Sequence, residues 1–146
     1  MPDRKTLERA KEDAREGKSP STQAGEFVRE EIHHIREGKH GASSPQQAIA
    51  IGLSKARRAG VKLSPPKGSA SLRKKAKQDT QAAKKGSKGK PSPSRSRAIE
   101  GALKREPRST ASHSALSRHA QQSAAKRGKL SRKNAAARAA RTRKAA

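Results

Sequence analysis

Three histidines and three glutamates close together in the sequence are the side chains best suited to bind a metal ion. They are His33, His34 and His40 with Glu30, Glu31 and Glu37, and imidazole and carboxylate groups are common zinc ligands. His33 and Glu37 share a helix face, as ligands four residues apart must. Adjacent histidines on a helix, however, point about 100° apart, and a clear fourth ligand is missing. The sequence therefore predicts no metal site and no cofactor.

A second group that could do chemistry is Ser112, His113 and Ser114, because serine and histidine together form the nucleophile and base of many hydrolases. No carboxylate lies near them in the sequence to orient the histidine. The chain also has only 16 large apolar side chains with which to enclose a cavity. We therefore expect no enzymatic activity and no catalytic residue.

Basic side chains are the largest set, and they are unevenly distributed. The chain has 37 Lys and Arg against 12 Asp and Glu, for a formal net charge of +25. Residues 1–40 hold nine of each sign, so the excess belongs to residues 41–146, which hold 28 basic and three acidic residues. Such a segment calls for a polyanionic partner, because each Lys or Arg that neutralises a nucleic-acid phosphate releases a counterion.

We expect phosphate contacts from basic residues that begin in the third predicted helix and continue to the C-terminus. These residues are Lys55, Arg57, Arg58, Lys74, Lys75, Lys84, Lys85, Arg95, Arg97, Lys104, Arg105, Arg118, Lys126, Arg127, Arg132, Lys133, Arg138, Arg141, Arg143 and Lys144. Base stacking is disfavoured because Phe27 is the sole aromatic residue. A recognition surface for base edges would have to come from the third helix, with Gln46 and Gln47 beside its basic residues, and phosphate contact alone is the simpler interpretation of that helix.

These observations favour non-enzymatic, histone-like binding of duplex DNA, with little sequence preference, that compacts or protects it. RNA is the alternative partner, in a ribosome-associated or RNA-associated factor. A hydrophilin-like stress protectant is a third interpretation, since mean hydropathy is −1.15. A membrane partner is disfavoured because the basic segment lacks an apolar face. The charged N-terminus and the absence of a long apolar run predict a cytoplasmic, nucleoid-associated protein.

The elements expected to position these residues are all helical. The predicted fold is a small all-α module, a helical hairpin plus a short N-terminal helix, with a largely disordered basic C-terminal tail that contains transient helices. Residues 1–20 form an exposed, marginal helix and a linker, and 21–63 form the hairpin, which could also dimerise or bind a protein. Residues 64–96 are a disordered linker rich in Lys, Ser, Gly and Pro, and 97–146 are an Ala-rich basic tail.

Helix-end signals define the predicted hairpin. Ser21 or Thr22 caps its first helix, which carries an apolar line from Ala24 to Ile35, and Gly38 ends it. Ser44 caps the next helix with Pro45 at its first position, and Gly60 follows its last turn. Ile49, Gly52, Leu53 and Ala56 share one face, where the small residues permit close helix approach, and Val61 and Leu63 are expected to fold back over the open end.

Transient helices are predicted at residues 97–105 and 112–127 of the tail. The final stretch, SRKNAAARAARTRKAA, has high helix propensity but only like charges. We expect it to be coil in water and helical when phosphates neutralise it.

The segment VREEIHHIREGKHGASSPQQAIAIGLSKARRAGVKL, from Val28 to Leu63, resembles the core of a family of small, basic, uncharacterised bacterial proteins. Gln47 to Gly60 carry the most specific part of this likeness, which covers about a quarter of the chain. The resemblance implies a bacterial, intracellular, basic protein with an association with DNA that rests on charge, and it assigns no catalytic or binding residue. The acidic pair Glu30 and Glu31 and the long basic extension depart from the family pattern.

Overall fold

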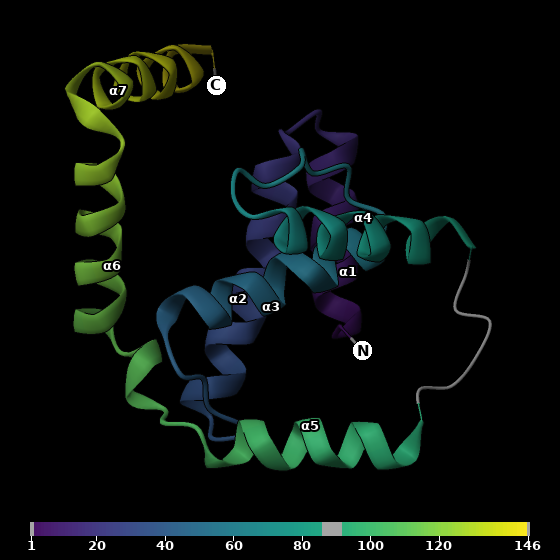
Figure 1. The fold of residues 1–146 in the computed structure, drawn as a ribbon. Helices are drawn as coiled ribbons and strands as arrows, with labels where there is room; N and C mark the ends of the chain where they lie inside the picture. Colours follow the sequence, from purple (N-terminus) through teal and green to yellow (C-terminus); the bar gives the residue numbers. More distant parts are fainter. Residues whose placement is uncertain (1, 86–91, 146) are drawn as a thin grey trace. The chain divides into compact units, whose positions relative to one another are not determined.

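A computed structural model describes residues 2–85 and 92–145, and within these ranges the ordered elements are helices (Figure 1). They are α1 (Arg4–Arg15), α2 (Pro20–Arg36), α3 (Pro45–Arg58), α4 (Ala70–Lys85), α5 (Pro93–Arg105), a 3-10 turn η1 (Ser109–Ala111), α6 (His113–Lys126) and α7 (Gly128–Ala145). The chain forms two compact units, Met1–Ala111 and Ser112–Ala146. The predicted all-α class is confirmed.

Helices α2 and α3 pack together as the predicted hairpin, and their N-terminal caps decide where each begins. Ser19, rather than Ser21 or Thr22, caps α2: its hydroxyl accepts the N–H of Thr22 at 3.3 Å. Pro20 follows at the first helical position, where its fixed φ suits the helix and its missing N–H costs nothing. Helix α3 begins as predicted, with the Ser44 hydroxyl accepting the N–H of Gln47 at 3.2 Å.

Close contact between α2 and α3 depends on Gly52. A Cβ at this position would lie 2.7 Å from Val28 Cα and 3.0 Å from Val28 N, so no larger residue fits without moving a backbone. Phe27 and Ala56 are fully buried beside this contact, and Val61 is buried over the open end with Leu63 packed against it. The small-residue contact and the fold-back of the chain after α3 are therefore both confirmed.

Helix α1 takes part in this core, whereas the sequence predicts an exposed and marginal helix. Thr6 and Ala10 are buried, and Leu7 packs against the same cluster as Phe27. Asp3 stands at the N-cap without a side-chain cap bond. Its backbone N–H instead donates to Glu30 Oε2 of α2 at 3.0 Å, which ties the start of α1 to α2. Packing against α2 supplies the stability that an isolated helix of this length lacks.

Helix α4 replaces much of the disordered linker expected over residues 64–96. Its residues Ala76 and Asp79 are 6% and 3% exposed, and Asp79 binds Ser54 and Arg58 of α3. Composition predicts a linker because it averages over a Lys-rich stretch. A single buried acid that pairs with another helix does not change that average. Residues 86–91 of the predicted linker lie outside the described residues.

The segment that follows α5 is anchored to the turn between α2 and α3. The N–H of Gly41 donates to the carbonyl of Leu103 at 2.8 Å, and Arg36 Nε donates to the carbonyl of Ala111 at 2.8 Å. A Cβ on Gly41 would meet the Glu106 backbone carbonyl, so glycine is required for this approach. Because Ala111 is fully buried, the first unit extends to residue 111, well beyond residue 63, where the predicted hairpin module ends.

The second unit consists of α6 and α7. Ser112 caps α6 by accepting the N–H of Ala115 at 3.3 Å, so α6 lies within the helix predicted over residues 112–127. None of the α6 residues is buried. The described side chains of α7 are exposed except that of Ala135, which is half-buried. This unit therefore has little apolar core of its own.

Candidate functional site

Most of the basic residues predicted to contact phosphate are exposed. On α4 and α5 these are Lys74, Lys75, Lys84, Arg95, Arg97, Lys104 and Arg105, and on α6, its C-cap and α7 they are Arg118, Lys126, Arg127, Arg132, Lys133, Arg138, Arg141 and Arg143. The side chains of Lys85 and Lys144 lie outside the described residues. The exposed cations are spread over several helices, so each unit has a basic surface of its own.

Lys55 does not belong to this surface, which corrects the prediction. Its Nζ lies 2.6 Å from Glu31 Oε2 and 3.1 Å from Glu30 Oε1. Burial alone would lower the pKa of Lys55, but the bonds and charges of the two glutamates outweigh it and raise the pKa. The ammonium group is therefore committed to joining α3 to α2, because breaking a buried ion pair would leave unpaired charge inside the protein.

Helix α3 presents only part of its predicted readout residues to solvent, because Gln46 and Arg58 are exposed whereas Gln47, Lys55 and Arg57 are not. Arg57 is only 9% exposed, so it is also withdrawn from the predicted phosphate contacts. The side-chain oxygen of Gln47 accepts both the N–H and the hydroxyl of Ser43, at 2.6 and 2.9 Å. Most of these polar side chains are therefore engaged in the fold, and α3 offers little surface for reading base edges.

Asp79 lies at the centre of the contact between α3 and α4. It accepts bonds from Ser54 Oγ at 2.7 Å and from Arg58 Nε at 2.8 Å, and Lys75 Nζ lies 3.6 Å away. Burial alone would raise the pKa of Asp79, but these bonds and positive charges outweigh it and lower the pKa. Arg58 and Lys75 are both more than half exposed, yet part of their charge is neutralised by Asp79.

The second unit differs from the first because it contains no acid. Residues 112–146 hold ten Lys and Arg and no Asp or Glu, for a formal charge of +10. By contrast, Lys104 of α5 pairs with Glu100 at 2.8 Å. Because no Asp or Glu of the same unit offsets these charges, the unit as a whole carries a positive charge that attracts an external polyanion.

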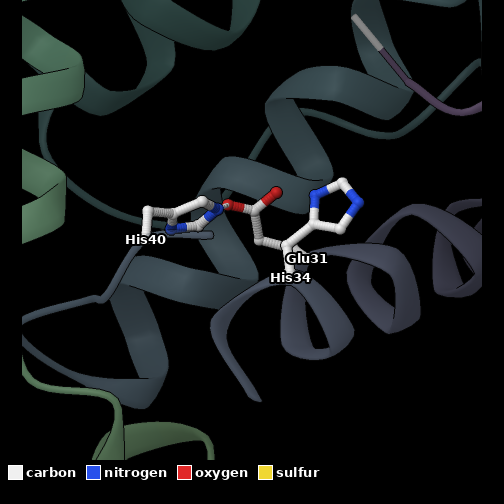
Figure 2. Close-up of side chains that lie close together, drawn as sticks. All are labelled: Glu31, His34 and His40. Carbon is white, nitrogen blue, oxygen red and sulfur yellow. Dashed lines mark ion pairs between the residues drawn. The ribbon is translucent and has the colours of Figure 1, made fainter. Parts of the chain in front are cut away.

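A compact cluster of Glu31, His34 and His40 is the arrangement that sequence reasoning set aside. Figure 2 shows the three side chains facing one another, and one potential ligand atom from each lies within 4.8 Å of the other two. Glu31 and His34 lie one turn apart on α2, and His40 comes from the turn after α2. The sequence argument placed His33 and Glu37 together, and these are indeed neighbours at 3.7 Å, but both are exposed. A short Gly-Lys turn before His40 is the signal that was available, since it returns the chain towards the end of α2.

Glu30 links this cluster to α1. Burial alone would raise its pKa, but bonds from Thr6, the Asp3 N–H and Lys55 outweigh it and lower the pKa. The other carboxylate near α1, Asp3, has its Oδ2 3.3 Å from His34 Nε2. His34 is thus in contact with groups of α1 on one side and close to Glu31 on the other.

No helix within the described residues is both long and apolar enough to cross a membrane.

In comparisons with known proteins, residues 15–68 match a family of unknown function (DUF6496). That range contains α2 and α3 and accounts for little more than a third of the chain. No curated protein matches the chain. No solved structure matches it either.

Proposed function

We propose that this protein is a non-enzymatic, histone-like protein of the nucleoid that binds duplex DNA by neutralising phosphates and thereby compacts or protects it. The observation that carries the proposal is the unit Ser112–Ala146, with ten basic residues, no acid and almost no buried side chain. Because no Asp or Glu in the unit offsets these charges, the unit carries a net positive charge that attracts a polyanion. Counterion release on contact with phosphate provides the driving force.

Low sequence preference follows from the chemistry of the exposed basic side chains. The basic side chains of α5, α6 and α7 suit phosphate oxygens, whereas readout of base edges needs a few placed side chains on a rigid element. Helix α3 was the candidate for that element, and its Lys55 and Arg57 are buried or ion-paired. Binding through phosphates alone tolerates many sequences.

A finer part of this proposal concerns the tail, residues 97–146. We propose that the tail is largely disordered in the free protein and gains helix when it binds DNA. Helix α7 contains Arg132, Lys133, Arg138, Arg141 and Arg143 among alanines, with no acid to offset their repulsion. Alanine favours the helix, but the like charges oppose it until phosphates neutralise them. Circular dichroism of the full chain should show helix content rising when duplex DNA is added at low salt.

The first unit is proposed to act as the folded anchor of the tail. Acidic side chains near its N-terminus form ion pairs with basic residues a few positions away in the sequence. Arg4 Nε lies 3.0 Å from Glu8, and Lys18 Nζ lies 2.8 Å from Asp13. Acids that are already paired in this way have little charge left with which to compete for the basic tail. The hairpin remains available for a homodimer or a protein partner.

Fluorescence anisotropy with a random duplex and a structured RNA of equal phosphate count, at about 50–300 mM salt, tests the proposal. We expect the logarithm of the DNA-binding constant to fall linearly with the logarithm of the salt concentration, with a slope of about −0.9 per phosphate neutralised. The protein should show no preference for RNA. Tighter binding to RNA by tenfold or more would assign the protein to RNA or ribosome factors. Absence of binding to both at 150 mM salt would favour the stress protectant instead.

A further inference from the structure

The cluster of Glu31, His34 and His40 combines burial with ligand-type side chains. The side chain of Glu31 is 1% exposed, and those of His34 and His40 are 13% and 15% exposed. The two rings meet edge to face with centroids 6.3 Å apart. Three potential ligand atoms within 4.8 Å of one another, drawn from a helix and the turn after it, form a preassembled group rather than a chance surface contact.

The contact between His40 and Glu31 needs a positive species between the two groups, either a proton or a metal ion. His40 Nδ1 lies 3.0 Å from the carbonyl oxygen of Gly41, and that carbonyl can only accept, so Nδ1 carries the hydrogen. In the neutral ring Nε2 then has a lone pair, and it points at Glu31 Oε1 from 3.0 Å. Two lone pairs that face each other at this distance repel unless a proton or a metal ion lies between them.

His34 has the same arrangement from the other side. Its Nε2 lies 3.3 Å from the Asp3 carboxylate, while its other ring nitrogen is turned towards Glu31 (Figure 2). When a histidine binds a metal through one ring nitrogen, its other ring nitrogen usually contacts a carboxylate or a carbonyl. Asp3 and the Gly41 carbonyl supply such partners for His34 and His40 respectively.

The local charges leave room for a divalent cation. Three carboxylates, those of Asp3, Glu30 and Glu31, surround the two imidazoles, and Lys55 is the ammonium group that pairs with Glu30 and Glu31. With neutral imidazoles, one ammonium group against three carboxylates leaves two negative charges, which one divalent ion would balance. Lys55 lies on Oε2 of Glu31, so Oε1 remains available on the side of His40.

We propose that Glu31, His34 and His40 bind one zinc ion. Two histidines and a glutamate are an established zinc ligand set, and water can complete the four-coordinate shell. A surface hollow of about 450 Å³ borders His34 and is lined by Asp3, Glu30 and several basic residues, whereas Glu31 and His40 do not line it. Because His40 belongs to the turn and the other two ligands to α2, the ion fastens the turn to the helix and stabilises the first unit.

Metal-free full-length protein, titrated with zinc alone by calorimetry at neutral pH, tests this inference. We expect one ion per chain in wild type, and affinity at least tenfold weaker in His40→Gln, because one of the three ligands is lost. His33→Gln is the matched control: the residue is adjacent to His34 but 65% exposed, and it faces Glu37. Zinc binding to this control should equal that of wild type.

A second pair of measurements keeps the test valid if a variant folds poorly. Zinc should raise the thermal unfolding midpoint of wild type and of His33→Gln but not of His40→Gln. Cobalt bound to wild type should give the intense visible absorption of a four-coordinate or five-coordinate site. The inference is overturned if zinc does not saturate at one ion per chain, if His33→Gln loses as much affinity as His40→Gln, or if bound cobalt retains the weak spectrum of its hexaaqua ion.

Discussion

The two units of this chain use charged side chains in opposite ways. In Met1–Ala111, Lys55 and Asp79 are paired across helix contacts, and Glu31 is almost completely buried. The unit Ser112–Ala146 has ten basic residues, on α6, its C-cap Arg127 and α7, and no Asp or Glu. The contrast teaches that net charge alone does not locate a binding surface: a cation that holds two helices together is committed to the fold, whereas a unit with ten cations and no Asp or Glu keeps a net positive charge.

Among substitutions in the unit Met1–Ala111, Gly52→Ala should have the largest effect on stability. The new Cβ would meet the backbone of Val28 at 2.7 Å, so α2 and α3 would have to separate. We expect the free energy of unfolding to fall by about 2 kcal/mol despite the better helix propensity of alanine. Denaturant unfolding followed by circular dichroism measures it.

Gly25→Ala on α2 is the control for that change, since a Cβ there meets nothing within 4 Å. It should stabilise the protein by up to about 1 kcal/mol. If both substitutions were neutral or stabilising, the close packing of α2 on α3 would not describe the folded protein.

A smaller effect is expected from Asp79→Asn, which weakens the contact between α3 and α4. We expect a loss of about 1–2 kcal/mol, because Arg58 loses its charged partner, and faster amide hydrogen exchange across residues 70–85. Glu100→Gln removes an exposed ion pair with Lys104 and should leave the free energy of unfolding almost unchanged, because solvent screens an exposed pair. Equal effects of the two changes would contradict the burial of Asp79.

The same contact predicts a pH dependence. Because the pKa of Asp79 is lowered in the folded protein, folding favours its ionised form. Its contribution is fully present above the unfolded pKa of about 4 and is lost as the pH falls through the lower folded value. As the pH falls below about 4, the unfolded value of an aspartate, wild type should therefore lose stability more steeply than Asp79→Asn, as measured by urea unfolding at each pH. Parallel pH profiles of the two proteins would show that Asp79 does not contribute.

The smallest effect belongs to the exposed pair of Arg4 and Glu8. Both side chains are well exposed, at 93% and 60%, so Glu8→Gln should change the free energy of unfolding by less than about 0.5 kcal/mol. DNA affinity should also stay within twofold of wild type. A marked increase in affinity would mean that N-terminal acids shield the basic tail.

Local signals in the sequence predict the hairpin well. Ser44 and Pro45 start α3, and Gly38 and Gly60 follow α2 and α3 with φ of 79° and 96°. Such features depend on neighbours within a few residues. Gly52 could also be recognised, because a glycine inside an apolar helix face indicates that another backbone lies close.

Long-range contacts could not be predicted in the same way. The bond from Arg58 to Asp79 spans 21 residues and the bond from Arg36 to Ala111 spans 75. Neither α4 nor the segment after α5 differs in composition from a linker, so only the partner surface explains why each is ordered. The candidate zinc ligands were missed for a related reason: His40 joins Glu31 and His34 through the path of a turn, which helix periodicity does not describe.

The most direct test of the central claim compares two full-length variants that lose the same charge. One replaces Arg132, Lys133, Arg141 and Arg143 of α7 with glutamine, and the other replaces Arg4, Lys5, Arg9 and Lys11 of α1. Binding to duplex DNA should weaken at least tenfold in the α7 variant at about 150 mM salt, with a salt slope reduced by about 3–4, and should stay within twofold of wild type in the α1 variant. Equal weakening in both would show that total charge governs binding, and would contradict the account.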